Sequence, residues 1–198
     1  FDMKTIGLCV TGSFCTFKKL IPEVKKLIDA GYDVIPVFSY AVANTDTRFY
    51  KAKDFYNDIK NITGRDPITT IEGAEPIGPE NKLDLIVIAP CTGNTLAKLN
   101  HAITDTPVLM AAKAHLRNNK PVLIAVSTND GLSANAKNIG ELMNRKNIYF
   151  VPFGQDNYVD KTNSLVARYD LLTESAECAL SGIQIQPVLY RDGKKEVK

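Results

Sequence analysis

The chain has 198 residues, a length that suits one domain with a sizeable buried core. Hydrophobic residues make up 44%, charged residues 23%, and the formal net charge is only +2. The basic residues are dispersed, so we expect neither a nucleic-acid partner nor a membrane partner. The first residues lack the apolar segment of a secretory signal, which favours a cytoplasmic location. The four cysteines form no C-x-x-C pair, so no metal site is expected.

The first third of the chain alternates between strand and helix patterns. Residues 5–11 form an apolar, β-branched run that predicts a buried strand. Apolar residues at helical spacing between positions 17 and 28 predict a helix that ends at Gly31, with a kink or a late start caused by Pro22. Residues 34–38 predict a second strand, in which Pro36 argues against a central position in a sheet. Residues 48–63 predict a second helix, which Gly64 closes.

The remaining segments repeat this alternation. Residues 65–82 predict a loop with one short strand near 68–71, and residues 83–89 form a Val/Ile/Leu run typical of a strand buried on both faces. Helices are expected at 94–101, 108–118, 136–145 and 164–180, with strands at 121–126 and 148–151. This order predicts an α/β fold: a three-layer, doubly wound, mostly parallel sheet of the Rossmann-like or flavodoxin-like type. We expect one domain over residues 1–190 and a frayed polar tail over 191–198.

Small polar residues follow four of the predicted strands, where ligands bind in open parallel sheets. These segments are residues 12–16, Ser39 with residues 44–47, residues 90–95 and residues 127–131. Glycine, hydroxyl groups and the first turn of a following helix suit a phosphate. Each segment alone is more typical of a helix cap or a turn. Four such segments at one sheet edge favour a binding site.

The segment A-P-C-T-G-N-T at residues 89–95, followed by A-I-T-D at 102–105, resembles the signature of the FMN-binding flavoprotein family. That family includes homo-oligomeric cysteine decarboxylases and flavin prenyltransferases. Its members also have Gly-Ser after the first strand and a hydroxyl residue after the second. The resemblance implies that FMN is held by these residues: Gly12, Ser13, Cys15, Ser39, Pro90, Cys91, Thr92, Asn94, Thr95, Ser127, Thr128, Asn129 and Asp130.

The same resemblance assigns parts of the ligand to parts of this set. Gly12, Ser13 and Ser39 are expected at the phosphate. Residues 92–95 are expected at the phosphate and the ribityl chain, and Pro90 and Cys91 at the flavin ring. Residues 127–130 are expected to close the pocket.

Residues 44–49, 104–113, 117–122, 127–130 and 150–156 resemble one branch of this family more closely. The resemblance implies one component of a two-component enzyme that works in the mother cell of spore-forming bacteria. There it acts with its partner to oxidise a dihydro precursor to an aromatic dicarboxylate. That partner resembles a nicotinamide-dependent dehydrogenase, so NAD(P) is expected only through the partner.

One catalytic group of the cysteine decarboxylases is missing. They use a histidine before the A-P-x-S-x-N-T strand, and residues 71–78 contain none. We interpret His101 as a residue that can lie near the site and His115 as a surface residue. Cysteine decarboxylation is therefore not expected, and no catalytic residue is assigned. Two alternatives stay open: a stand-alone flavin enzyme acting on carbon–carbon bonds, and a non-catalytic scaffold with a vestigial flavin pocket.

Other polar residues have two interpretations each. Cys15 at a helix start is either a reactive thiolate or, as we favour, a small packing residue. Three glutamates either form an acidic rim or belong to a solvated loop, which is favoured: Glu72, Glu75 and Glu80. Four basic residues either attract a dicarboxylate or are ordinary exposed charges, which is again favoured: Lys98, Lys113, Arg117 and Lys120.

Overall fold

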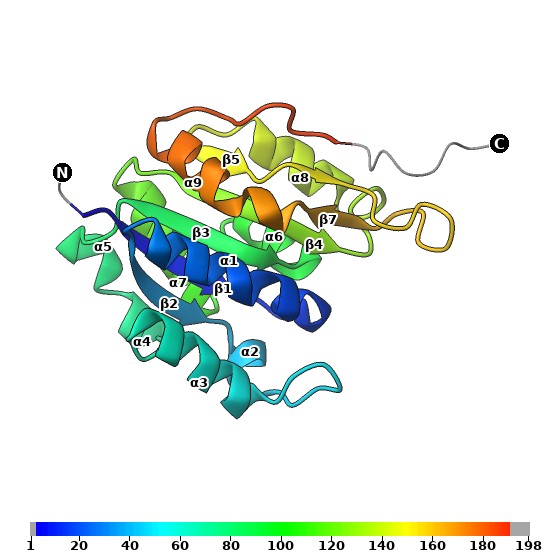
Figure 1. Cartoon of the computed structure of the whole chain (residues 1–198). Helices are drawn as coiled ribbons and strands as arrows, with labels where there is room; N and C mark the ends of the chain where they lie inside the picture. Colours follow the sequence, from blue (N-terminus) through cyan, green and yellow to red (C-terminus); the bar gives the residue numbers. More distant parts are fainter. Residues whose placement is uncertain (1–2, 191–198) are drawn as a thin grey trace.

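The computed structural model describes residues 3–190 and contains one seven-stranded sheet between two layers of helices (Figure 1). The strands lie in the order β2 (Asp33–Phe38), β1 (Thr5–Val10), β3 (Leu85–Cys91), β4 (Val122–Thr128), β7 (Leu165–Ala167) and β6 (Phe153–Gly154). Strand β5 (Ile148–Phe150) also pairs with β4. The predicted α/β class with a mostly parallel sheet is confirmed.

Strands β2, β1, β3 and β4 are parallel neighbours, so their carboxyl ends meet at one edge. We call this edge, with the loops that follow it, the carboxyl rim: residues 11–16, 39, 90–95 and 127–131. Strand β3 is buried along its whole length, as its apolar run predicts. Strand β2 is at the end of the sheet order, which accommodates Pro36.

Helices cover both faces of the sheet. Helix α1 (Phe17–Asp29) packs against α3 (Ala52–Thr63) and α9 (Leu172–Leu180) on one face. Helices α6 (Gly93–Asn100), α7 (Pro107–Arg117) and α8 (Ala136–Met143) cover the other face (Figure 1). The buried apolar side chains of strands and helices form one connected cluster. No helix within residues 3–190 is long and apolar enough to cross a membrane.

Helix ends follow the sequence closely where glycine ends them. Gly31 and Gly64 have φ values of 90° and 70°, so each takes the left-handed conformation after its helix, as predicted. Of the two effects expected from Pro22, the late start is wrong, because α1 begins at Phe17 and runs through the proline, while the kink stays a prediction.

The segment after β2 differs from the prediction. A short helix, α2 (Tyr40–Asn44), follows Ser39, and α3 begins at Ala52 rather than at residue 48. Residues 65–82 hold one isolated bridge, between Ile68 and Val37, instead of a strand near 68–71. Two short helices follow it, α4 (Ile71–Ala74) and α5 (Ile77–Glu80).

The predicted helix over 164–180 is wrong in its first half. Residues 165–167 form β7, a 3₁₀ turn covers Tyr169–Leu171, and α9 begins only at Leu172. Strand β7 pairs antiparallel with the end of β4 and with β6. The sheet is therefore mixed, with antiparallel pairs on the β7 and β6 side. Residues 165–167 form a strand despite their helical spacing, because β4 and β6 offer strand partners. The tail at 191–198 lies outside the described residues.

Candidate functional site

Thr11 joins the ends of β1 and β3. Its buried hydroxyl donates to the Pro90 carbonyl at 2.7 Å and accepts the Thr92 backbone N–H at 3.0 Å. The Thr11 backbone N–H also donates to the Pro90 carbonyl, at 3.3 Å. The Ala89–Pro90 peptide bond is cis. The Thr11 side chain thus holds residues 90–92, before α6, against the loop after β1.

Ser13 and Ser127 connect the loop after β1 to the end of β4. Their hydroxyl oxygens are 2.6 Å apart, although the residues are 114 positions apart in the sequence. Strand β3 lies between β1 and β4, so this bond crosses above the end of β3. The Thr16 hydroxyl donates to the Ser13 carbonyl at 2.7 Å and steadies the same turn. Two of the predicted loops therefore meet directly.

Ser39 places the end of β2 at the same edge. Its backbone N–H donates to the Val10 carbonyl at 3.0 Å. Its side-chain oxygen accepts the Val42 N–H at 3.4 Å and caps α2. The cap interpretation of this serine holds, and the residue is also at the carboxyl rim.

Thr92 and the residues after β4 surround the first turn of α6. The Thr92 hydroxyl accepts the Thr95 N–H at 3.2 Å and lies 3.0 Å from the Thr95 hydroxyl. Opposite this turn, Asp130 accepts hydrogen bonds from the Thr128 hydroxyl and, at 2.8 Å, from the Asn135 amide. Asp130 thus belongs to a bonded scaffold, while Asn94 and Asn129 are exposed at the rim.

Gly93 permits this close approach. A Cβ on Gly93 would lie 2.5 Å from the Asn135 Nδ2, 2.6 Å from the Thr128 Oγ1 and 2.8 Å from the Asp130 Oδ1. A residue with a Cβ therefore fits between α6 and the scaffold only if these side chains move.

Neutral donors dominate the carboxyl rim. The eight-residue helix α6 begins there, and N–H groups in the first turn of a helix have no partner inside the helix. They also form the positive end of the helix dipole. With the Thr92 hydroxyl beside them and the Ser13 hydroxyl at the same rim, these groups suit an anionic or acceptor-rich ligand.

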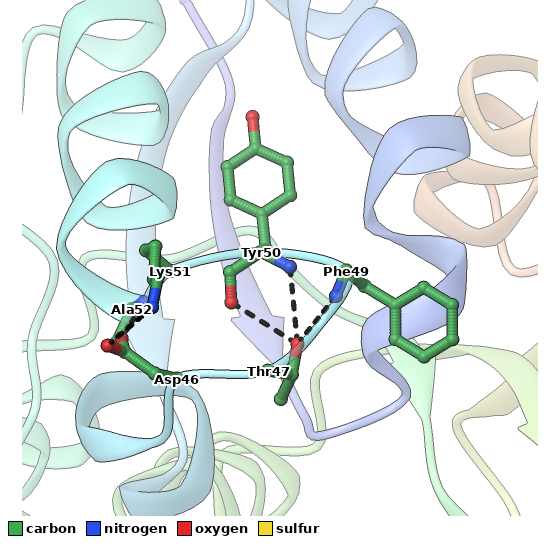
Figure 2. Close-up of polar contacts among 6 residues, drawn as sticks. All are labelled: Asp46, Thr47, Phe49, Tyr50, Lys51 and Ala52. Carbon is green, nitrogen blue, oxygen red and sulfur yellow. Dashed lines mark hydrogen bonds and ion pairs between the residues drawn. The ribbon is translucent and has the colours of Figure 1, made fainter.

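The loop between α2 and α3 is a closed turn (Figure 2). The Thr47 hydroxyl accepts the N–H groups of Phe49 and Tyr50, both at 3.2 Å, and the Asp46 carboxylate accepts the Ala52 N–H at 2.9 Å. The Ala52 N–H bond is the largest cause of the lowered pKa of Asp46. This turn explains why α3 starts four residues later than its sequence predicts.

Comparison with known proteins assigns this arrangement to a family. A family model described as Flavoprotein matches residues 2–173, most of the chain. The chain belongs to the flavoprotein family. Every residue of the carboxyl rim lies inside the matched range.

Relatives of this flavoprotein agree in sequence and in fold. The chain is 48% identical over 189 residues to the B subunit of dipicolinate synthase from Bacillus subtilis (strain 168), and the match covers 96% of this chain and 94% of that protein. The crystal structure of the corresponding B subunit from Bacillus halodurans superposes with a TM-score of 0.87 at 49% identity, covering 95% of this chain and 96% of that one. A dodecameric FMN-dependent UbiX-like decarboxylase from Escherichia coli O157:H7 shares the fold, with a TM-score of 0.60 at 18% identity over 75% of this chain and 79% of that one.

The two cysteines predicted at the site of this flavoprotein lie in different surroundings. Cys15 is exposed, with its sulfur 3.9 Å from the Ser13 hydroxyl, so the packing interpretation of Cys15 is wrong. Cys91 is completely buried at the end of β3, and burial raises the pKa of its thiol. Neighbouring residues therefore cover the Cys91 thiol.

Neither histidine lies at the carboxyl rim. His101 follows the last residue of α6, so it is about 12 Å along the helix axis from the rim. His115 is only 1% exposed on α7, so its interpretation as a surface residue is wrong. It lies on the inner side of α7, where the apolar spacing of that helix continues through it.

The three glutamates and two of the four basic residues are exposed, as we favoured, whereas Lys98 and Lys120 are half-buried. The three glutamates are exposed on or beside α4 and α5, which precede the amino end of β3 rather than its carboxyl end. Lys98 pairs with Asp105, and the Lys120 ammonium donates to the Leu83 carbonyl. Lys113 and Arg117 are exposed on α7.

Sequence reasoning missed several residues that build the rim. Thr11 and Asn135 hold its loops, and Tyr169 lies beneath it with its hydroxyl beside Thr16 and Ser127. The position of Thr11 at the end of a strand is a signal that reasoning could have used. Tyr169 offered none, because its segment has helical spacing.

Replacing Thr11 with valine tests the link between β1 and β3. Thr11→Val keeps the side-chain shape but removes a donor and an acceptor, which leaves the Thr92 N–H and part of the Pro90 carbonyl without a partner. We expect the free energy of unfolding to fall by about 1–3 kcal/mol. Urea denaturation of both proteins measures the difference.

Thr5→Val is the matched control at the other end of the same strand. There the backbone N–H of Thr5, not its side chain, bonds Asp84, at 2.9 Å. We expect a change within about 0.5 kcal/mol. Equal effects of the two substitutions would contradict the role of Thr11.

Proposed function

We propose that this flavoprotein is the B subunit of a dipicolinate synthase and binds FMN at its carboxyl rim. The observation that carries the proposal is 48% identity to such a B subunit over 96% of the chain. The reaction is the oxidation of a dihydrodipicolinate-type precursor, a small dicarboxylate, to dipicolinate. The chain works with the A subunit of dipicolinate synthase in the cytoplasm of the mother cell during sporulation.

The rim supports FMN as the ligand because its donors are neutral and converge. The Ser13–Ser127 pair, the Thr92 cap and the start of α6 place hydroxyl and N–H groups together. Such groups bind a phosphate and polar hydroxyl chains without requiring a positive side chain. Gly93 allows the start of α6 to lie close to the end of β4. The side chain of Asn94 is exposed and can therefore contact a ligand.

The two subunits divide the chemistry in this proposal. Oxidation removes two electrons and two protons from the precursor. The A subunit brings NAD(P)⁺, which accepts a hydride, and the second proton leaves to solvent. Bound FMN supplies a ring that can accept or donate two electrons. The residues of this chain bind and orient the ligand, and none is assigned as a catalytic residue.

We also propose that the chain forms a homo-oligomer. One relative that shares the fold is described as dodecameric. Sedimentation of the purified chain measures its assembly state. A monomer at working concentration would contradict this part of the proposal.

Reconstitution tests the function. The A and B subunits are mixed with the precursor, NAD(P)⁺ and either FMN or no flavin, and dipicolinate is measured by its ultraviolet absorbance. We expect product only with both subunits, and more with FMN. Asn94→Ala and Ser13→Ala are expected to lower FMN affinity and the FMN-dependent rate together.

Two other outcomes select the alternatives. Dipicolinate formation that needs both subunits but ignores FMN and both substitutions favours a scaffold with a vestigial pocket. Flavin-dependent release of CO2 from an aromatic or amino acid by this chain alone favours a stand-alone enzyme. Dipicolinate formation by the A subunit alone would contradict the proposal.

A further inference from the structure

Tyr169 is a buried tyrosine beneath the carboxyl rim, in the 3₁₀ turn before α9. Its side chain is 4% exposed, and its hydroxyl is beside the side chains of Thr16 and Ser127. It nevertheless makes no hydrogen bond of good geometry to any residue between 3 and 190. A buried hydroxyl without a partner weakens the native state, so its presence at this position needs a reason.

The protons of the neighbouring hydroxyls limit what Tyr169 can do. Thr16 already donates its proton to the Ser13 carbonyl, at 2.7 Å. Ser13 and Ser127 share one hydrogen bond at 2.6 Å, which needs only one of their two protons. Either serine can be the donor, so the direction of this bond is open. A third group that donates a proton to one of the two serine oxygens makes that serine the donor in the shared bond.

A phenol is a better donor and a poorer acceptor than an aliphatic hydroxyl. Burial is the main cause that raises the pKa of Tyr169, so its proton stays in place across the physiological range. The Ser127 oxygen, beside the phenol, can accept this proton. Ser127 then donates to Ser13, which leaves the Ser13 proton available to another acceptor.

We propose that Tyr169 is a positioning residue that orients the Ser13–Ser127 pair, so that Ser13 donates to an acceptor atom of the ligand at the rim. This inference rests on the proposed flavin site. It adds a buried residue from the β7–α9 segment to a site otherwise built from the residues that follow β1, β2, β3 and β4. The chain of donors runs from Tyr169 to Ser127, then to Ser13, then to the ligand.

Tyr169→Phe removes only the hydroxyl. We expect the dissociation constant for FMN, measured by quenching of flavin fluorescence, to rise about tenfold, the effect of one lost hydrogen bond. The urea midpoint of the ligand-free chain is expected to stay equal or to rise, because the removed hydroxyl had no partner. A purely structural hydroxyl would show the opposite pattern: unchanged affinity and a lower midpoint. That pattern would overturn the inference.

A second variant tests the order of the donors. Ser127→Ala removes the next link, so it is expected to weaken FMN binding and to make Tyr169→Phe silent when both are combined. Additive effects of the two substitutions would overturn the inference. Tyr149→Phe on β5, outside the rim, is the matched control and is expected to leave FMN affinity unchanged.

Titrations with FMN and riboflavin identify the acceptor atom. An equal loss for both ligands in Tyr169→Phe places the Ser13 donor at the flavin ring or the ribityl chain, and a loss for FMN alone places it at the phosphate. If the unsubstituted chain binds neither ligand, the proposed flavin site itself fails. If the unsubstituted chain binds FMN and Tyr169→Phe binds equally well, only the role of Tyr169 fails.

Discussion

Gly93→Ala is expected to lower the free energy of unfolding by about 1–3 kcal/mol and to abolish measurable flavin binding. The added Cβ would lie 2.5 Å from the Asn135 Nδ2 and 2.6 Å from the Thr128 Oγ1. Carbon and polar atoms do not approach this closely, so α6 or the loop after β4 must move. Either movement displaces the start of α6 from the other donors of the rim.

The side chains around Gly93 cannot move independently of one another, because hydrogen bonds join them. Thr128 and Asn135 both donate to Asp130, and Asn138 donates to Asn135 at 2.8 Å. Asn138 also accepts from Asn100, at the end of α6, at 3.0 Å. Moving one side chain therefore breaks bonds that join α6 to α8. This network explains why one methyl group is expected to have an effect on both stability and binding.

Gly140→Ala is the matched control, because Gly140 is also helical and a Cβ there meets nothing within 4 Å. Alanine favours a helix over glycine, so this substitution is expected to stabilise the chain by about 1 kcal/mol. Urea denaturation and FMN titration are measured for both variants. The argument fails if Gly93→Ala keeps the stability and the flavin affinity of the unsubstituted chain.

The parallel core was predictable because its strands carry their own signal. A strand buried on both faces reads as a continuous apolar run, as β3 and residues 122–126 of β4 do. Gly31 and Gly64 marked the helix ends because only glycine takes the left-handed conformation there without strain. These features depend on neighbouring residues in the sequence.

The errors fall where distant contacts decide the structure. Residues 165–167 become β7 because β4 and β6 offer strand partners, and no local pattern reports this. The start of α3 is set by Asp46, which caps it from six residues away. The short helix α2 was missed although Ser39 caps it, since five residues carry too little helical spacing to be recognised.

In the candidate site, too, some features follow from the local sequence and others depend on contacts between distant residues. The loops that converge at the carboxyl rim were predictable, because the carboxyl ends of parallel strands meet at one edge. The bonds between the loops were not, since Ser13 and Ser127 are 114 residues apart. Tyr169 was unpredictable for the same reason as β7. Fold-level rules thus locate a site, while long-range contacts decide which side chains support it.

His115 was misplaced because histidine is found both buried and exposed, so its residue type does not predict its environment. Its burial has a measurable consequence. Burial, with a smaller contribution from Lys120, lowers its pKa from 6.5 to about 4, and its Nε2 has no hydrogen bond to residues 3–190. In the unfolded chain His115 therefore binds a proton below about pH 6.5, whereas in the folded chain it does so only below about pH 4. Stability is lost as pH falls through this window, by about 3 kcal/mol in total.

His115→Asn removes this titration and tests it. We expect the variant to be less stable at pH 7, because asparagine fills the space poorly. Between pH 7 and 4.5, however, the unsubstituted chain should lose about 2–3 kcal/mol more unfolding free energy than the variant. Carboxylates that titrate in the same range contribute equally to both proteins and cancel in the difference. Parallel pH profiles for the two proteins would contradict this prediction, because His115 would then bind its proton equally well in the folded and the unfolded chain.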